Sequence, residues 1–398
     1  MTSFDRDVVI VGGCGRVGIP LGTVFAEEGC RVALYDINAA AVESVSAGRM
    51  PFIEPGADEA LRRVVDSGQL IATTDASVVA RSEAVIIAVG TPVDEHLNPD
   101  LTAVSAVVGS LEPLLLDGQL LILRSTVFPG VTAMVNEMLL RSGREIDVCF
   151  CPERIAEGKA MAELRSLPQI VSGFTDRGYK RAAALFERIA DETVRLEPTE
   201  AELAKLFTNS WRYIRFAVAN QFFMIANDYG IDFETVRAAV RHNYPRAADL
   251  PGAGFAAGPC LLKDTMQLAA FNNNSFTLGH ASMMINEGLP LYLVSNLERR
   301  YDLSTMTVGI LGMAFKSDTD DRRDSLSYKL KRLLRFKASS VLCTDPHVVD
   351  DPALVPLEDV IAQSDLLVIG APHREYATLA PAVPVVDVWN LLGRGVRL

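Results

Sequence analysis

The strongest constraint on the fold is a predicted strand, glycine turn and helix at the start of the chain. Residues 7–12 form a short apolar run rich in β-branched side chains, and they lead directly into Gly13-Cys14-Gly15-Arg16-Val17-Gly18. In such a unit the first glycine permits a tight turn, the second admits a pyrophosphate, and the third lets the helix pack on the strand. We therefore expect Gly13, Gly15 and Gly18 to bind a dinucleotide at the helix N-terminus.

The next predicted strand indicates which dinucleotide is bound. It covers residues 31–35 and is followed by Asp36, 18 residues after Gly18. An acid at this place accepts a hydrogen bond from a ribose 2′-OH and would repel a 2′-phosphate, so NAD is favoured over NADP. A similar unit that binds another adenosyl ligand, such as S-adenosylmethionine, is the alternative that this motif alone leaves open.

Three further apolar runs, separated by helical stretches, predict a parallel doubly wound α/β sheet. They cover residues 84–89, 119–123 and 147–150. Ligands bind at the carboxyl ends of the strands in such a sheet. The polar turns at these ends are candidate site segments: Gly90-Thr91-Pro92, Ser125-Thr126-Val127-Phe128-Pro129-Gly130 and Cys151-Pro152-Glu153-Arg154.

Length and composition narrow the class of protein. A chain of 398 residues suggests two or three domains, and a net charge of -12 gives no attraction to nucleic acid or anionic membranes. The six cysteines are scattered without metal-binding spacing, and nothing at the N-terminus resembles a signal peptide. No apolar run reaches the ~18 residues that a membrane span needs. We expect a soluble cytoplasmic protein without a metal site.

A long helix is predicted from Thr199 to Tyr229, with acids in its first turn and Gly230 after its end. Lys205 and Asn209 are four residues apart and therefore share one face. A solvated lysine with a polar neighbour is the usual interpretation, but the flanking apolar side chains indicate a partly covered turn. A partly buried ammonium beside an amide can stabilise a developing oxyanion.

A glycine-rich loop over residues 252–264 carries one cysteine, one lysine and one carboxylate. Its glycines and proline predict a tight loop that lets the backbone approach a ligand, and Lys263 and Asp264 continue into a helix. We interpret Cys260 as a nucleophile whose thiolate is stabilised by nearby cations or by a helix N-terminus. A buried structural cysteine is the alternative for an isolated thiol.

A second α/β unit is predicted near the C-terminus. Its strands cover residues 307–312, 340–345, 365–370 and 385–388. The unit lacks GxGxxG, so no second dinucleotide is predicted. The loop after its first strand holds Phe315, Lys316 and Arg323, whose cations can meet a diphosphate, and a solvated charge run is the alternative.

Taken together, seven motifs resemble the UDP-glucose/GDP-mannose dehydrogenase family over essentially the whole chain. They are GCGRVG with Asp36, GTP at 90–92, STVFPG at 125–130, CPERIAEG at 151–158, ELAKLFTNS at 202–210, GFAAGPCLLKD at 254–264 and GMAFKSDTDDRRDS at 312–325. The resemblance implies two Rossmann-like domains, 1–197 for NAD and 300–398 for the nucleotide sugar. A helical central domain, 198–299, is expected to join them and to form a homodimer.

The resemblance also implies a chemistry. Family members oxidise C6 of a nucleotide-linked hexose to a carboxylate with two NAD+, and Cys260 would add to the intermediate aldehyde. The resulting thiohemiacetal would lose a second hydride to become a thioester, which water hydrolyses. Lys205 and Asn209 match the pair that steadies the oxyanion at C6. The groups that match those positioning water and moving protons are Asp264, Glu153 and Thr126.

Binding roles follow from the same resemblance. Lys263 and Arg323 match contacts to the cofactor, to which Thr91 is added as a candidate. Phe315 and Lys316 match contacts to the nucleotide sugar. Two further candidates for the substrate are Phe255, in the cysteine loop, and Arg246, which resembles an arginine offered to the neighbouring subunit.

Departures from the UDP-glucose pattern concern the 2-substituent of the sugar. Pro152-Glu153-Arg154 replaces Pro-Glu-Phe, and Tyr244-Pro245-Arg246 precedes the cysteine loop, both as in UDP-N-acetylmannosamine dehydrogenases. Arg154 and Ile155 are therefore expected to recognise this substituent. Trp389 is a further departure, because many members carry arginine there as an anchor to the nucleotide.

The favoured activity is oxidation of a UDP-N-acetylhexosamine, above all UDP-N-acetylmannosamine, which would supply a uronate for polysaccharide biosynthesis. UDP-glucose 6-dehydrogenase is the nearest alternative. A catalytically silent module that binds NAD and a nucleotide sugar would not need Cys260, Lys205, Asn209 and Asp264 together. A dehydrogenase that stops after one hydride transfer would not need the thiol.

Overall fold

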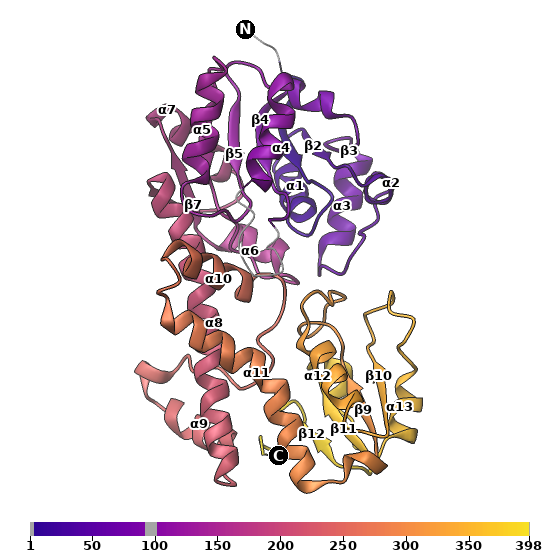
Figure 1. Cartoon of the computed structure of the whole chain (residues 1–398). Helices are drawn as coiled ribbons and strands as arrows, with labels where there is room; N and C mark the ends of the chain where they lie inside the picture. The colour runs from indigo at the N-terminus through magenta and orange to yellow at the C-terminus, as the bar shows by residue number, and fades with distance from the viewer. Residues whose placement is uncertain (1–3, 92–101, 398) are drawn as a thin grey trace. The chain divides into compact units, whose positions relative to one another are not determined.

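The computed structural model of the protein describes residues 4–91 and 102–397. Its contacts divide the chain into two compact units, Met1–Thr208 and Asn209–Leu398, and the boundary falls inside one long helix, α8 (Pro198–Asp228). Each unit contains a mainly parallel sheet, so the predicted α/β class is confirmed (Figure 1).

The first unit is built on a sheet whose described strands follow the order β3-β2-β1-β4-β5-β6-β7-β8. Neighbouring strands are parallel except β6 and β7. The strands are β1 (Arg6–Val11), β2 (Val32–Tyr35), β3 (Leu70–Thr73), β4 (Ser82–Ile87), β5 (Leu120–Leu123), β6 (Asp147–Phe150), β7 (Gln169–Gly173) and β8 (Thr193–Leu196). The sequence predicted β1, β2, β4, β5 and β6 within two residues at each end, whereas β3, β7 and β8 were not predicted.

Helices cover both faces of this sheet, which explains why its strands are apolar runs and not alternating patterns. Val8 and Ile10 belong to one core with α1, whereas Val9 and Val11 belong to the core on the opposite face. The helices are α1 (Gly18–Glu27), α2 (Ala39–Ser46), α3 (Ala57–Asp66), α4 (Ala103–Leu111), α5 (Val131–Arg141), α6 (Ala160–Ser166) and α7 (Asp176–Phe186), with 3-10 turns η1 (Ala76–Arg81) and η2 (Glu112–Leu114).

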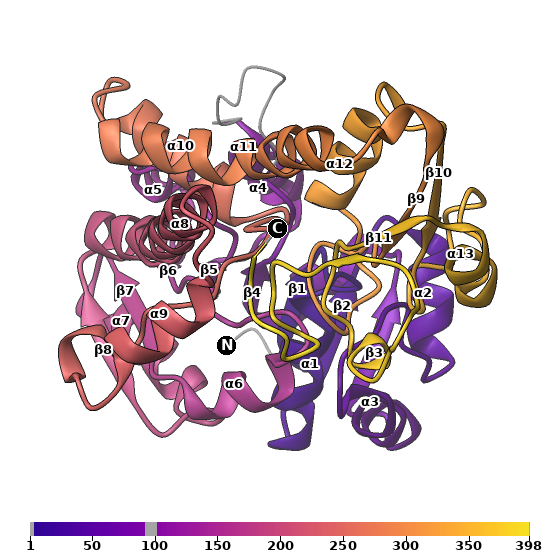
Figure 2. The same ribbon diagram turned by 90° about the horizontal axis from the view of Figure 1, so that it is seen from below.

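The second unit combines helices with a smaller sheet. Its helical part holds most of α8, which begins one residue before the predicted start and ends one residue before the predicted end. Phe223 of α8 packs in one core with Leu289 and Leu293 of α11, and α11 also contacts α10 and α12 (Figure 2). The remaining helices and turns are α9 (Phe233–Arg241), η3 (Pro245–Ala247), α10 (Leu261–Phe271), α11 (Thr277–Arg300), η4 (Leu303–Thr305), α12 (Leu326–Arg335), α13 (Leu357–Gln363) and η5 (Arg374–Tyr376).

The second sheet has the strand order β10-β9-β11-β12, and its described pairs are all parallel. The strands are β9 (Thr307–Leu311), β10 (Ser340–Thr344), β11 (Leu366–Ile369) and β12 (Val385–Val386). The second Rossmann-like unit is thus confirmed, while domain boundaries at 197/198 and 299/300 stay a prediction. Among the described residues, no helix has the length and apolar character needed to cross a membrane.

Candidate active site

The glycine turn after β1 has the shape that a dinucleotide requires. A Cβ on Gly13 would lie 2.6 Å from the carbonyl oxygen of Ile10, and one on Gly18 would lie 2.4 Å from that of Gly13, so both positions must remain glycine. At Gly15 the nearest atom would be 3.5 Å away, which leaves its backbone open to a ligand. The left-handed conformation lies at Gly12 (φ +74°), so the tight turn begins one residue earlier than predicted.

Asp36 lies beside this turn because Tyr35 of β2 is in register with Val11 of β1. Its Oδ2 accepts the backbone N–H of Cys14 at 3.0 Å, and its Oδ1 accepts that of Asn38 at 2.9 Å. A carboxylate offers about four lone-pair positions. Asp36 therefore retains acceptor capacity for a ribose hydroxyl, and the turn fits the predicted NAD.

The turns at the carboxyl edge of the first sheet are tied together. The hydroxyl of Ser125 donates to the carbonyl oxygen of Val89 at 2.7 Å, which joins the turns after β4 and β5. Thr126 is half-buried in the second of these turns, and Thr91 is half-buried at the end of the first. Pro92 of the GTP motif lies outside the described residues. Arg16 of the glycine turn forms an ion pair of 2.7 Å with Glu157, which links that turn to the CPERIAEG motif.

Glu153 is buried and fully engaged inside the first unit. Arg124, whose side chain is completely buried, donates to Oε2 from NH2 at 2.6 Å and from Nε at 3.0 Å. Oε1 accepts the backbone N–H groups of Arg154 at 2.7 Å and Ile155 at 2.9 Å. Four donors therefore occupy the carboxylate, an arrangement that suits holding the turn in place more directly than moving a proton. Sequence reasoning missed Arg124, although it directly precedes the STVFPG motif.

The two residues expected to recognise the sugar are anchored in the first unit. The guanidinium of Arg154 donates to the carbonyl oxygen of Pro168, and burial together with the Arg124 charge lowers the pKa of Arg154. Ile155 packs against the core that contains α1. Lys205, which is also buried, belongs to this unit and lies one turn before Asn209 on α8.

Asn209 and the residues after Cys260 form a buried group in the second unit. Nδ2 of Asn209 donates to Oδ2 of Asp264 at 2.6 Å, and Nζ of Lys263 lies 3.2 Å from Oδ1 of the same carboxylate. Asp264 is 1% exposed. Asn209 and Asp264 are 55 positions apart in the chain, and the fold brings an amide, a carboxylate and an ammonium together.

Cys260 differs from the other cysteines in exposure, and all six lie in the described part of the chain. It is exposed, whereas Cys14, Cys30, Cys149, Cys151 and Cys343 are buried. Burial raises the pKa of the other five thiols, for example to about 12 for Cys14 and Cys151. Cys260 is the N-cap of α10, and the dipole at the N-terminal end of a helix favours a negative charge. The alternative of a buried structural cysteine is therefore wrong for Cys260.

The cysteine loop is held by two residues, Asn220 and Trp389. Asn220 was not predicted as a site residue, and Trp389 was noted only as a departure from the arginine of many family members. Asn220, fully buried on α8, accepts the N–H of Gly254 at 2.9 Å and donates to its carbonyl oxygen at 3.0 Å. Trp389 packs against the same glycine, where a Cβ would lie 2.2 Å from its ring, and it contacts Phe255 edge-on. Its Nε1 donates to the carbonyl oxygen of Ile369 at 3.1 Å. Trp389 thus supports the loop at a position where many family members carry an arginine.

The loop after β9 holds the remaining candidates. Phe315 packs against Gly258, whose Cβ would lie 2.5 Å from the ring, and the ammonium of Lys316 is 5.7 Å from the centre of that ring. Arg323 forms an ion pair of 2.6 Å with Asp321. Arg246 is exposed and stacks on the ring of Tyr244. Phe315 and Lys316 therefore lie beside the cysteine loop within the second unit.

Three domain models of one known family match successive parts of the chain. Residues 7–190 match the NAD binding domain of the UDP-glucose/GDP-mannose dehydrogenase family, residues 199–287 match its central domain, and residues 309–394 match its UDP binding domain. The chain belongs to this family. The predicted cofactor, NAD, and the predicted enzyme class, an NAD-dependent nucleotide-sugar dehydrogenase, are confirmed.

Relatives within the family are similar over nearly their whole length. The UDP-N-acetyl-D-mannosamine dehydrogenase of Yersinia pestis is 30% identical, with 99% of each chain covered. The structure of a UDP-glucose dehydrogenase from Pyrobaculum islandicum has a TM-score of 0.89 at 29% identity, covering 97% of this chain and 94% of that one. The structure of the UDP-D-ManNAc dehydrogenase from Pyrococcus horikoshii has a TM-score of 0.87 at 28% identity, covering 94% and 91%.

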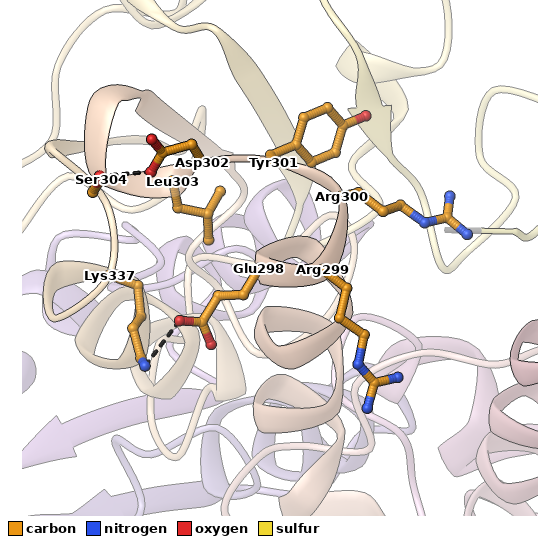
Figure 3. A pocket seen from close by; sticks show the side chains of 8 residues that line it. All are labelled: Glu298, Arg299, Arg300, Tyr301, Asp302, Leu303, Ser304 and Lys337. Atoms are coloured by element: carbon orange, nitrogen blue, oxygen red, sulfur yellow. Dashed lines mark hydrogen bonds and ion pairs between the residues drawn. The ribbon is translucent and has the colours of Figure 1, made fainter.

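A pocket at the end of α11 contains none of the candidate residues of this dehydrogenase. It is lined by Glu298, Arg299, Arg300, Tyr301, Asp302, Leu303, Ser304 and Lys337 (Figure 3). Lys337 is paired with Glu298 at 2.9 Å, and the hydroxyl of Ser304 donates to Asp302 at 2.6 Å.

Proposed function

We propose that this dehydrogenase oxidises C6 of a UDP-N-acetylhexosamine, UDP-N-acetyl-D-mannosamine in the first place, to the corresponding uronate. The observation that carries the proposal is the similarity to a UDP-N-acetyl-D-mannosamine dehydrogenase over 99% of both chains. The Pro152-Glu153-Arg154 and Tyr244-Pro245-Arg246 segments support the same subtype.

The chemistry follows from an exposed thiol beside a buried polar group. NAD, when held by the glycine turn and Asp36, supplies the hydride acceptor for both oxidation steps. After the alcohol has lost one hydride and one proton, the thiolate of Cys260 adds to the aldehyde carbon and forms a thiohemiacetal. Loss of the second hydride leaves a thioester, and water replaces the thiol to give the carboxylate. The covalent bond retains the aldehyde between the two steps.

The group around Asp264 supports these steps from within the second unit. Asn209 orients Asp264 through a short hydrogen bond, and Lys263 lies near the other carboxylate oxygen. Asp264 can therefore accept a proton from attacking water. Before that step, the ammonium of Lys263 balances the charge of the buried carboxylate, and the amide of Asn209 donates a hydrogen bond to it. Lys205 is proposed to stabilise the oxyanion at C6 with Asn209, and Thr126 to position water. For Glu153, the four donors on its carboxylate support a positioning role.

The first experiment follows NADH formation with UDP-N-acetylmannosamine, UDP-N-acetylglucosamine, UDP-glucose and GDP-mannose, counting NADH per sugar consumed. We expect two NADH per UDP-N-acetylmannosamine and a higher kcat/KM than for UDP-glucose. A higher kcat/KM for UDP-glucose would favour the alternative that the Pyrobaculum islandicum structure represents. NAD binding without turnover of any of the four sugars would favour the catalytically silent module.

The covalent step is tested by Cys260→Ala. We expect at most one NADH per site from this variant, because an aldehyde without a thiohemiacetal does not pass on its second hydride efficiently. Cys30→Ala is the matched control, because that thiol is buried, its pKa is raised and it lies outside the glycine turn. Steady turnover to the uronate by Cys260→Ala would exclude the covalent route.

The enzyme is further proposed to be a homodimer joined along α8. Five apolar side chains are exposed on one face of this helix: Phe207, Trp211, Val218, Phe222 and Ile225. They extend over roughly 27 Å at a rise of 1.5 Å per residue, which allows a second copy to pack the same stripe by two-fold symmetry. Sedimentation should give a dimer for the wild type and a monomer for Phe222→Glu. A monomeric wild type would contradict this arrangement.

The location and pathway remain predictions from the sequence. Scattered cysteines without disulfide bonds in the structure fit a cytoplasmic enzyme, and the proposed uronate product fits the supply of sugar acids for polysaccharide biosynthesis.

A further inference from the structure

A buried carboxylate organises the turn after β9 in the UDP-binding domain. Oδ2 of Asp345 accepts the backbone N–H groups of Met313 at 2.6 Å and Ala314 at 2.8 Å. Its Oδ1 accepts those of His347 at 2.8 Å and Val348 at 3.0 Å. The Asp345 side chain is 0% exposed. This carboxylate thus fixes the start of the loop that continues to Phe315 and Lys316.

His373 extends the same network to the far side of the loop. Its Nδ1 accepts the backbone N–H of Asp318 at 2.9 Å, and its Nε2 lies 3.1 Å from Oδ2 of Asp345. A backbone N–H can only donate, so Nδ1 carries the lone pair and Nε2 carries the proton. The imidazole is completely buried and therefore forms a defined bridge from Asp345 to Asp318. Asp318 itself has a left-handed backbone (φ +53°), which a non-glycine residue adopts only with local support.

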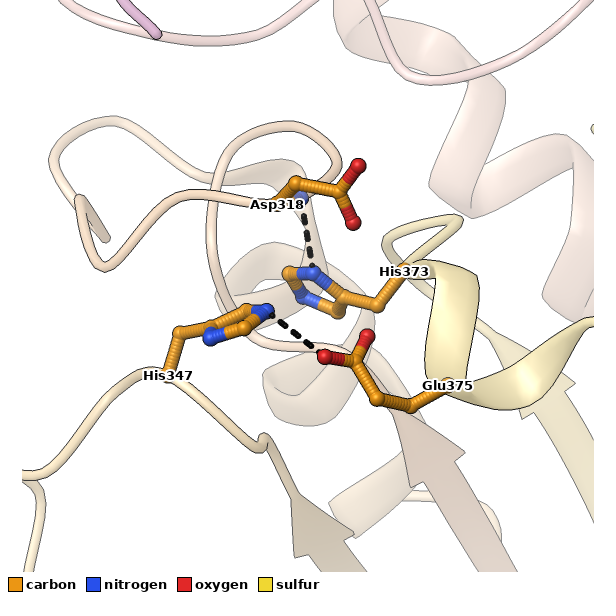
Figure 4. Close-up of side chains that lie close together, drawn as sticks. All are labelled: Asp318, His347, His373 and Glu375. Carbon is orange, nitrogen blue, oxygen red and sulfur yellow. Dashed lines mark hydrogen bonds and ion pairs between the residues drawn. The ribbon is translucent and has the colours of Figure 1, made fainter. Parts of the chain in front are cut away.

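The side chains around this bridge have the composition of a metal site, but their bonds indicate another role. Ligand atoms of Asp318, His347, His373 and Glu375 lie within 4.8 Å of one another (Figure 4). However, both ring nitrogens of His373 have partners inside the protein. The Asp318 carboxylate is bound by Arg374 at 2.8 Å, and Nε2 of His347 lies 3.3 Å from Glu375. A metal ion would have to displace these contacts.

We propose that His373 is a positioning residue for the nucleotide sugar, acting through the backbone of Asp318. Phe315 and Lys316 are expected to contact the nucleotide sugar, and they lie between two fixed points of the backbone. Asp345 holds the residues before them, and His373 holds Asp318 after them. Loss of the acceptor at Nδ1 would release the second point and let the loop sample other conformations. The proposal rests on the proposed function for the identity of the sugar, but not for the role of the hydrogen bond.

Two substitutions separate the two ends of the imidazole. His373→Asn places an amide oxygen near the former Nδ1, so it can still accept the Asp318 N–H. His373→Gln places an amide nitrogen near the former Nε2, so it can still donate to Asp345 but loses the acceptor. Glu375→Gln is the matched control, because it changes the same cluster without touching the bridge.

The first measurement uses UDP as the probe and does not depend on turnover. Calorimetry should give a UDP Kd about tenfold higher for His373→Gln than for the wild type, the effect of one hydrogen bond. His373→Asn and Glu375→Gln should remain within about twofold, and NAD affinity should not change in any variant. Hydrogen exchange of the amides at residues 316–319 should accelerate in His373→Gln and stay protected in His373→Asn.

Kinetics then tests the role during turnover. For whichever UDP-sugar the wild type oxidises, His373→Gln should raise KM about tenfold with little change in kcat. Equal losses in His373→Asn and His373→Gln, or unchanged UDP affinity in His373→Gln, would overturn the proposal. So would stoichiometric Zn²⁺ binding that Glu375→Gln abolishes and that alters UDP affinity. If no UDP-sugar were oxidised, the proposed function would fail, while the UDP and exchange measurements would still decide this inference.

Discussion

The two Rossmann-like units of this dehydrogenase use the same acid in opposite ways. In both, the second strand of the unit ends beside the first β-α turn and is followed by an aspartate: Asp36 after β2 and Asp345 after β10. Asp36 accepts two backbone N–H groups among the described residues. Asp345 accepts four backbone N–H groups and the proton of His373 within the same described part of the chain.

The difference shows how one fold provides two kinds of site. A carboxylate has about four lone-pair positions, so Asp345 is saturated by its own protein while Asp36 can still receive a ribose hydroxyl. The second unit therefore cannot select a dinucleotide through this acid. It retains the geometry of the turn but uses the carboxylate to hold the loop that carries Phe315 and Lys316. The following three predictions test this contrast.

The largest expected effect is on stability. Asp345→Asn should lower the free energy of unfolding by at least ~3 kcal/mol, because an amide cannot replace a buried carboxylate that accepts several N–H groups. Asp36→Asn should change it by less than ~1 kcal/mol. Urea unfolding of both variants measures the difference. Equal destabilisation would show that the two acids have the same structural role.

The next effect concerns acid stability. Burial by itself raises the pKa of Asp345, but the hydrogen bond from His373 and those from the backbone N–H groups outweigh it and lower the pKa to about 2. A carboxyl group with a lowered pKa stabilises the fold above its unfolded pKa, and this contribution disappears as the pH falls towards 2. The wild type should lose about 2 kcal/mol from this group between pH 4 and pH 2.

The same unfolding experiment on Asp345→Asn should show a shallower loss over this pH range. The remaining slope belongs to other carboxylates with lowered pKa values, such as Asp7 and Asp232. If the free energy of unfolding of Asp345→Asn fell as steeply with pH as that of the wild type, Asp345 would not be the source of this acid sensitivity.

The smallest of the three effects is on cofactor choice. Asp36→Asn should reduce kcat/KM for NAD about tenfold, because it removes a charge-assisted hydrogen bond to the ribose. It should also narrow the preference over NADP, since a 2′-phosphate no longer meets a negative charge. Steady-state kinetics with both cofactors gives the ratio. A variant that retained the full NAD preference would show that Asp36 does not select the cofactor.

Much of the fold, and the cysteine loop of the candidate site, could be predicted from the sequence because local patterns encode local structure. The β-branched runs before Gly13 and Gly312 predicted β1 and β9, and the helical periodicity after Thr199 predicted α8 within one residue at each end. The edge strands β3 and β8 escaped prediction because most of their residues are not buried, so they lack the buried apolar run of the equally short β2, β5 and β6. The strand β7 escaped prediction because Gln169, Ser172 and Gly173 surround its two apolar residues. Cys260 could be singled out because its loop has an unusual composition, and its exposure agrees with that interpretation.

Contacts between residues on different strands could not be predicted from the sequence, because they depend on the register in which the strands pair. Leu311, Thr344 and Ile369 are aligned in the second sheet, so the residues after them meet at its carboxyl edge. His373 and Asp318 are 55 positions apart in the chain, and Arg124 and Glu153 are 29 apart. Nothing in the sequence indicated that Glu153 would be saturated by Arg124, or that Trp389 would pack on Gly254.

By itself, the sequence determined the two Rossmann-like units, the NAD motif, the family and the cysteine loop, because these are written in composition and short-range order. The tertiary structure decided which acid remains available to a ligand and which one holds the protein together. Hydrogen-bond capacity is limited, and only the folded arrangement of donors determines how much of it is already used.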